Sequence, residues 1–220
     1  MGTIADRRVE EKQRRRAAIL DAAEAEAAQH GIEGLRMEQV ARRARISRAL
    51  LYVYFRDRGD LQLGLCERGL ELLATRFEEA AARQRNGLER IAAMGRAYLA
   101  FSQEFPVFFA ALARFQAEES APGEAGGCER ACVDAGARVH AAMFAAIESG
   151  QRDGSIDRQA GTPAAIAMTL WGYLHGIIQL AATRGAVLAE HGVTARALGE
   201  QALLLARRGL AAAGGRGPRG

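Results

Sequence analysis

The chain has 220 residues, which is enough for one or two domains with a packed core. Apolar residues make up 49% of it and prolines number only 4, so the composition excludes a disordered chain and favours helix. The formal net charge is +4, but seven arginines stand against three acidic residues between Gly34 and Asp60. Such a local excess indicates contact with a polyanion, although a solvated surface would have the same composition.

The hydrophobic periodicity predicts an all-α fold of about nine helices. Residues 1–12 are predicted to form a mobile charged arm. Three short basic helices follow, predicted at residues 12–30, 37–44 and 47–55. Gly31 ends the first helix and Ser47 is placed to cap the third. Asp57 is predicted to cap a long fourth helix that runs to about Arg85.

Longer and more apolar helices occupy the remainder of the chain, predicted at residues 87–104, 106–115, 128–151, 163–183 and 194–210. The stretch 118–127 is predicted to be a loop, and the tail 214–220 to be disordered. The uncharged segment 159–183 is long enough to cross a bilayer, but it contains His175, Gln179 and several glycines. We interpret it as a helix buried on most sides and predict no membrane contact.

The second and third predicted helices, joined by a tight turn, indicate a helix-turn-helix. Ala41, in the helix predicted at residues 37–44, is small where the next helix must cross it. Leu51 supplies an apolar anchor in that next helix. The other face of the third helix is then free to enter a major groove, and it carries Ser47, Arg48, Ala49, Leu50 and Tyr52. An ordinary helical hairpin with a charged exterior would satisfy the same short pattern.

The wider stretch AAILDAAEAEAAQHGIEGLRMEQVARRARISRALLYVYFRDRGDLQLGL is more specific. It resembles the N-terminal domain of the TetR family of bacterial transcription repressors over about residues 17–65. The shared skeleton consists of Ile19 to Ala23, Gly31, VARRARIS and LLYVYFRDRGDL. The later helices are similar to the family's variable ligand-sensing domain in order and length. The resemblance therefore implies a repressor that a small effector releases from its operator.

The resemblance also implies roles for single residues. Ser47, Arg48 and Tyr52 stand at DNA-contacting positions, and Arg36 and Arg58 at phosphate-contacting positions. Arg48 is suited to a guanine edge and Leu50 to a thymine methyl group. The complete predicted DNA-binding set is Arg36, Arg45, Ser47, Arg48, Ala49, Leu50, Tyr52, Tyr54 and Arg58.

Two departures from the family pattern carry structural expectations. Arg45 replaces the turn glycine, so we expect it to adopt a positive φ at some cost. Glu26 and Ala27 stand where bulky apolar residues are common, which predicts a packing deficit of roughly 2–4 kcal/mol unless neighbours fill the space.

A helix-turn-helix protein usually reads a palindromic site as a two-fold dimer. The resemblance implies that the last two helices of each copy form the interface, and we predict Gly172, Gly176, Leu198, Ala202 and Leu205 there. We predict domains at residues 1–56 for DNA binding and 57–213 for ligand binding and dimerisation. A small hydrophobic or aromatic effector is predicted to contact Met94, Tyr98, Phe101, Phe105, Phe108, Phe109, Met143, Phe144, Met168, Trp171 and His175.

Other chemistry has weaker signals. Cys128 and Cys132 are four residues apart with His140 beyond them, which leaves a thiol or metal sensor open beside simple packing. No nucleophile triad, phosphate loop or carboxylate pair shows motif spacing, so we predict no enzyme, no cofactor and no metal site. The first residues lack a signal-peptide core, which favours the cytoplasm. The alternative function is a helical small-molecule-binding protein with no DNA role.

Overall fold

The structure is a computed structural model that describes residues 4–114 and 127–212. Within these ranges the chain forms ten α-helices and one 3₁₀ helix, and the predicted all-α fold is confirmed. The predicted disordered tail 214–220 and most of the predicted loop 118–127 lie outside the described residues. The chain divides into two compact units, and each is described by itself.

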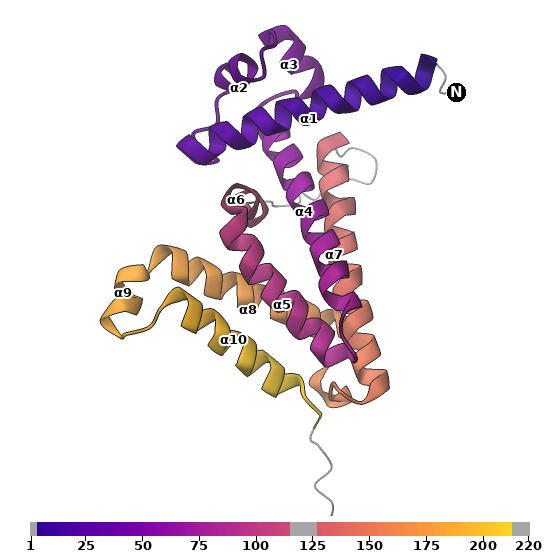
Figure 1. The fold of residues 1–220 in the computed structure, drawn as a ribbon, viewed down its shortest axis with the longest axis vertical. Helices are drawn as coiled ribbons and strands as arrows, with labels where there is room; N and C mark the ends of the chain where they lie inside the picture. The colour runs from indigo at the N-terminus through magenta and orange to yellow at the C-terminus, as the bar shows by residue number, and fades with distance from the viewer. Residues whose placement is uncertain (1–3, 115–126, 213–220) are drawn as a thin grey trace, which may run out of the picture. The chain divides into compact units, whose positions relative to one another are not determined.

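The first unit comprises Met1–Glu71 and Phe105–Gly136. It contains α1 (Ile4–His30), α2 (Met37–Arg43), α3 (Arg48–Tyr54), the beginning of α4 (Arg58–Ala82), α6 (Pro106–Arg114) and the beginning of α7 (Gly127–Asp153). Helix α1 contacts both α2 and α6, and α2 contacts α3 (Figure 1). The side chain of Asp57 accepts a hydrogen bond from the backbone N–H of Asp60 at 2.8 Å, as a residue that caps the start of α4 should.

The prediction of a mobile arm over residues 1–12 is wrong for residues 4–12, because α1 already begins at Ile4. Arginine, glutamate, glutamine and lysine are good helix formers, and this stretch contains no glycine or proline after Gly2. An ion pair between Glu11 and Arg15, four residues apart with 3.1 Å between the charged atoms, adds a small stabilisation. The charged N-terminal residues therefore extend the first helix.

The core of the first unit collects apolar side chains from α1, α3 and α4. The residues predicted to face inward from the first helix, Ile19, Leu20, Ala23 and Ala27, are all buried. Phe55, which follows α3, is also buried and packs against α4 at Gly64. A Cβ atom on Gly64 would lie 2.9 Å from the Phe55 ring, so only glycine allows this close approach.

The second unit comprises Leu72–Glu104 and Ala137–Gly220. Besides the remainder of α4 and α7, it contains α5 (Gly87–Glu104), the 3₁₀ helix η1 (Arg158–Ala160), α8 (Pro163–Thr183), α9 (Gly185–Glu190) and α10 (Ala195–Leu210). Helices α5, α8 and α10 pack on one another (Figure 1). Gly95 of α5 lies at this junction, because a Cβ there would be 2.6 Å from Leu203 and 3.4 Å from Leu174.

The interpretation of segment 159–183 as a helix buried on most sides is wrong for the single chain. Only 17% of the most apolar window of α8 is buried, although its length and hydropathy would suit a membrane span. Ile166, Ala167 and Leu174 face the interior of the unit, whereas Trp171 and Leu180 are exposed. Periodicity indicated an apolar helix but could not show how many of its sides the chain itself would cover.

Candidate nucleic-acid interface

The turn between α2 and α3 has the backbone that the sequence predicted. Arg45 adopts a φ of 55°, the left-handed conformation that the family glycine would adopt without strain. The N–H of Ile46 donates to the carbonyl of Ala41 at 3.0 Å, which closes the turn. Ser47 caps α3, because its side-chain oxygen accepts a hydrogen bond from the N–H of Leu50 at 3.1 Å. These contacts fix the direction in which α3 leaves α2.

Helix α3 has a buried face and an exposed face. Leu51 anchors the buried face, and Ala49, Tyr52 and Val53 lie on the opposite face, spaced as i, i+3 and i+4. Val53 is 73% exposed, which is unusual for a β-branched apolar residue, and it was not among the predicted DNA-binding residues. The signal was present, since Val53 lies on the side of the helix away from Leu51. We name the exposed residues Arg48, Ala49, Tyr52 and Val53 the reading face.

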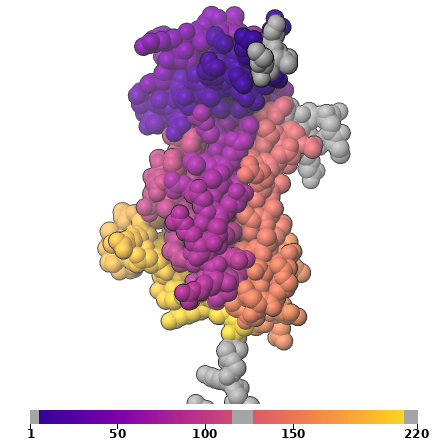
Figure 2. Space-filling view, turned by 45° about the vertical axis from the view of Figure 1, so that its right-hand side comes forward, coloured from indigo at the N-terminus to yellow at the C-terminus, as the bar shows by residue number. Residues whose placement is uncertain are grey.

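Most of the predicted DNA-binding residues are exposed on the first unit. The exposed ones are Arg36, Arg45, Ser47, Arg48, Ala49, Tyr52 and Arg58, whereas Leu50 and Tyr54 are half-buried. The residues of α1, α2 and α3, in indigo and violet, form one continuous block in Figure 2. The exposure agrees with a DNA-contacting role, and that role stays a prediction for each residue.

The guanidinium of Arg48 forms an ion pair with Glu38 of α2. Both side chains are 59% exposed, so this pair is worth little in free energy and can be exchanged for another anion. Arg58 likewise donates to the backbone carbonyl of Glu33 at 3.2 Å. Two of the predicted DNA contacts are therefore held near the surface by weak local acceptors.

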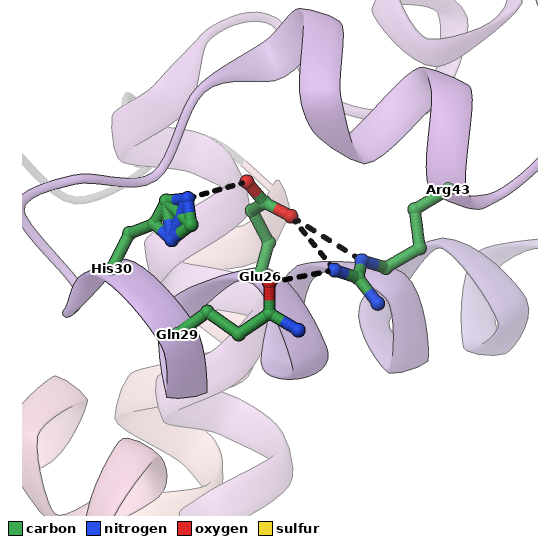
Figure 3. Close-up of polar contacts among 4 residues, drawn as sticks. All are labelled: Glu26, Gln29, His30 and Arg43. Atoms are coloured by element: carbon green, nitrogen blue, oxygen red, sulfur yellow. Dashed lines mark hydrogen bonds and ion pairs between the residues drawn. The ribbon is translucent and has the colours of Figure 1, made fainter.

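Arg43, at the end of α2, pairs with a buried carboxylate of α1 (Figure 3). Its Nε and Nη2 lie 3.3 and 3.2 Å from Oε2 of Glu26, and Nη2 also donates to Gln29 at 3.1 Å. His30 approaches the other carboxylate oxygen of Glu26 at 3.8 Å. Glu26 is buried, and its carboxylate is paired at this core position. The pair joins α1 to the end of α2.

The second unit contains a polar contact within an aromatic cluster. The hydroxyl of Tyr98 lies 2.9 Å from Nδ1 of His175, and the ring of Trp171 lies 6.3 Å from that of His175 and 5.8 Å from that of His140. Burial raises the pKa of Tyr98 to about 12, so its hydroxyl stays protonated. Burial lowers the pKa of both His140 and His175, which favours neutral rings. The cluster therefore presents no net charge to a ligand.

The predicted effector-binding residues are distributed over the two units. Phe105, Phe108 and Phe109 belong to the first, where the rings of Phe105 and Phe108 stack at 6.0 Å. The others belong to the second, where Met94, Tyr98, Phe101 and Met143 are buried, Phe144 and His175 half-buried, and Met168 and Trp171 exposed. Ligand contact stays a prediction for all of them.

The predicted dimer residues differ in exposure. Gly172, Gly176 and Leu205 are exposed, and a Cβ on either glycine would meet nothing within 4 Å. Leu198 is half-buried, and Ala202 is buried inside the second unit. The large apolar residues exposed on the two helices are Met168, Trp171, Leu180, Leu204 and Leu205, which we name the apolar face.

Over the described parts of the chain, no three histidine, cysteine or acidic side chains are grouped as a metal ion would require. A capped helix-turn-helix with an exposed arginine-rich face, joined to a larger helical unit, defines a DNA-binding regulator. Residues 19–63 match the model of bacterial regulatory proteins of the tetR family, and residues 91–204 match the tetracyclin repressor-like C-terminal domain. The chain therefore belongs to the TetR family, and it is a transcriptional regulator with a DNA-binding helix-turn-helix.

Individual relatives agree with this assignment. The HTH-type transcriptional repressor SCO4008 of Streptomyces coelicolor is 39% identical over 59 residues, which cover 27% of this chain and 31% of that protein. A protein of unknown function from Rhodococcus sp. RHA1 is 28% identical with a TM-score of 0.70, covering 90% of this chain and 95% of its own. The regulator FadR from Bacillus subtilis, in complex with stearoyl-CoA, has a TM-score of 0.66 at 14% identity over 88% of this chain and 98% of its own. The last likeness shows the fold alone.

Proposed function

We propose that the protein is a homodimeric repressor that leaves a palindromic operator when a small hydrophobic or aromatic effector binds. The observation that carries the DNA role is the reading face, which stands exposed on a capped helix with Arg36, Arg45 and Arg58 exposed on the same unit. Arginine forms bidentate contacts with guanine and with phosphate. The relative SCO4008 is a repressor by name and supports the direction of regulation.

The homodimer is supported by the apolar face on α8 and α10. Trp171 is 44% and Leu205 52% exposed, and water contact with such side chains is unfavourable unless a partner covers them. The partner we propose is a second copy of the chain. A two-fold dimer presents two reading faces, which can bind the two half-sites of a palindrome about 34 Å apart. Gly172 and Gly176 leave open space on α8 in which a partner helix can approach closely.

The effector class is supported by the composition of the second unit and by one relative. The neutral cluster of Tyr98, Trp171 and His175 offers aromatic surface with few polar groups, which suits an apolar ligand. FadR of Bacillus subtilis binds stearoyl-CoA with the same fold, so acyl thioesters are the first compounds to test. A cytoplasmic location is part of this proposal.

The test of DNA binding begins with selection of bound sequences from random duplexes by the full chain. We expect the selected sequence to be a palindrome. We expect affinity for it to fall about 10³-fold between 50 and 200 mM salt, because each phosphate contact releases counterions from the DNA and added salt opposes that release. Arg196→Ala, which removes an exposed arginine of α10 outside the reading face, should leave this affinity unchanged. Affinity that does not respond to salt, or selection that recovers no sequence, would favour a small-molecule-binding protein without a DNA role.

The test of regulation measures operator affinity during titration with acyl-CoA thioesters and with apolar aromatic compounds. Linkage requires that an effector which releases DNA must itself bind more weakly to the DNA-bound protein. A compound that binds the second unit tightly and leaves operator affinity unchanged would refute the proposed response.

A further inference from the structure

All three cysteines of the chain lie in the first unit, although they come from distant parts of the sequence. Cys66 on α4 and Cys132 on α7 are 66 residues apart in sequence, and their sulfur atoms are 2.8 Å apart. The two residues are 1% and 0% exposed, so neither is available to a large reagent in the folded chain. Direct contact between two buried thiols is the observation on which the inference rests.

The distance between the sulfur atoms is close to that of a covalent bond. A disulfide requires about 2.05 Å between sulfurs, so a movement of about 0.8 Å would bring this pair to bonding distance. The two thiols already share a hydrogen bond, which orients the sulfur atoms toward each other.

Cys128 is held in a different environment, four residues before Cys132. Its sulfur lies 3.8 Å from Nη2 of Arg16, and that guanidinium also pairs with Glu67 at 2.5 Å. Asp60 also interacts with the thiol of Cys128. The third cysteine therefore has polar partners of its own, and it serves as an internal control for the other two.

We propose that Cys66 and Cys132 are a redox-responsive modification site, which a small hydroperoxide converts to a disulfide that ties α4 to α7. One sulfur of the pair attacks the terminal peroxide oxygen, the O–O bond breaks, and water or an alcohol leaves as a sulfenic acid forms. The second sulfur then attacks the sulfur of the sulfenic acid, the S–S bond forms, and water leaves. Two thiols lose two protons and two electrons, and the hydroperoxide is reduced.

The surroundings of the two sulfurs slow the reaction. The hydrogen bond with Cys132, together with burial, raises the pKa of Cys66, so this thiol keeps its proton while the pair is reduced. Burial of both sulfurs makes the reaction slower than that of an exposed thiol and selects small oxidants over bulky ones.

The disulfide would restrain α4, which is the helix that follows the reading face. Cys66 lies on the third turn of α4, whereas Cys132 lies near the start of α7, both within the first unit. Because α4 connects the helix-turn-helix to the rest of the chain, oxidation is expected to change operator affinity. This consequence rests on the proposed function, whereas formation of the disulfide does not.

The test uses the full chain, treated with hydrogen peroxide, unfolded in the presence of an alkylating reagent and analysed by mass spectrometry. We expect only one of three thiols to be alkylated, a cross-linked peptide pair that contains Cys66 and Cys132, and recovery of all three thiols after reduction. The oxidised protein should also unfold at a temperature several degrees higher, because the cross-link restricts the unfolded chain.

The controls separate the pair from the third cysteine. Cys128→Ser should leave the cross-link unchanged, and Cys132→Ser should abolish it, with circular dichroism to check that each variant folds. The wild-type peptide map does not depend on either variant. Three alkylated thiols after oxidation, or a cross-link that involves Cys128 or a second chain, would overturn the proposal.

The DNA measurement distinguishes the two proposals. Reduced protein that fails to select any DNA sequence would count against the proposed function and leave the disulfide proposal standing. Reduced and cross-linked proteins with equal operator affinity would refute the restraint of α4. We expect at least a fivefold difference in operator affinity between them, reversed by dithiothreitol.

Discussion

The reading face of α3 and the apolar face of α8 and α10 are both exposed, but they differ in chemistry. The first combines the charged Arg48 with Ala49, Tyr52 and Val53, and Arg36, Arg45 and Arg58 are exposed on the same unit. The second exposes Trp171 and Leu205 to water without a compensating charge. A face with an exposed arginine is typical of a partner that binds reversibly, whereas an exposed apolar face is typical of a permanent partner.

The largest effect should follow from charging the apolar face. Leu205→Asp places a carboxylate where a second copy is proposed to pack, so we expect a monomer by analytical ultracentrifugation. Operator affinity should fall 100-fold or more, because the two reading faces no longer bind as one unit. Val133→Asp is the control, since Val133 is an exposed apolar residue of α7 that does not belong to this face. A Leu205→Asp dimer of unchanged affinity would remove the distinction between the two faces.

A smaller effect is expected from arginines near the reading face. Arg48→Ala should reduce affinity for the selected operator by about 1–3 kcal/mol and relax the choice of base at one position. Arg58→Ala should weaken binding to all sequences about equally and lower the salt dependence by about one phosphate contact. Both are measured by competition titrations with operator and unrelated duplexes. Unchanged binding in both variants would show that this face does not read DNA.

The ion pair of Glu26 with Arg43 provides a measure of stability. Glu26→Ala leaves Arg43 without its main partner, and we expect a loss of about 1–2 kcal/mol in the free energy of unfolding by urea titration. The value is below that of a fully buried pair because the side chain of Arg43 is 36% exposed. The double change of Glu26 and Arg43 to methionine should restore much of the loss. A larger loss in the double variant would contradict this account.

The smallest effect concerns pH and the second unit. Burial lowers the pKa of His175 below its ordinary value near 6.5, so the unfolded chain binds protons more readily than the folded one. The contribution of this residue to stability is complete above about pH 6.5 and decreases as the pH falls through the folded value. His175→Gln should therefore flatten the decrease in unfolding free energy between pH 7 and 5.5. An unchanged slope would mean that this ring is solvated.

Local signals in the sequence predicted much of the helix-turn-helix. The cap at Ser47, the positive φ of Arg45 and the anchor Leu51 depend on residues within a few positions of one another, so a short pattern was sufficient. The pairing of Glu26 with Arg43 could not be predicted, because it joins residues 17 apart on two helices. The contact of Cys66 with Cys132 spans a longer separation still.

The second unit shows a different limit of sequence reasoning. Periodicity located α8, but whether its apolar sides are covered depends on how α5 and α10 pack against it. The burial of Ala202 in the same stripe as the exposed Leu205 has the same origin. Patterns of apolar residues predict that a surface will be covered and leave open whether the chain itself or another copy covers it.

Among the described residues, Arg45 is the one amino acid other than glycine with a positive φ. An L-residue held in this conformation carries about 1–2 kcal/mol of strain, which glycine would avoid. Glycine would also have no side chain, whereas arginine places a cation on the turn. The hydrogen bond from the N–H of Ile46 to the carbonyl of Ala41 closes this turn. The chain thus holds a permanent positive group at the point where its two short helices change direction. Replacing Arg45 with glycine should therefore raise the melting temperature of the protein and lower its affinity for any polyanion.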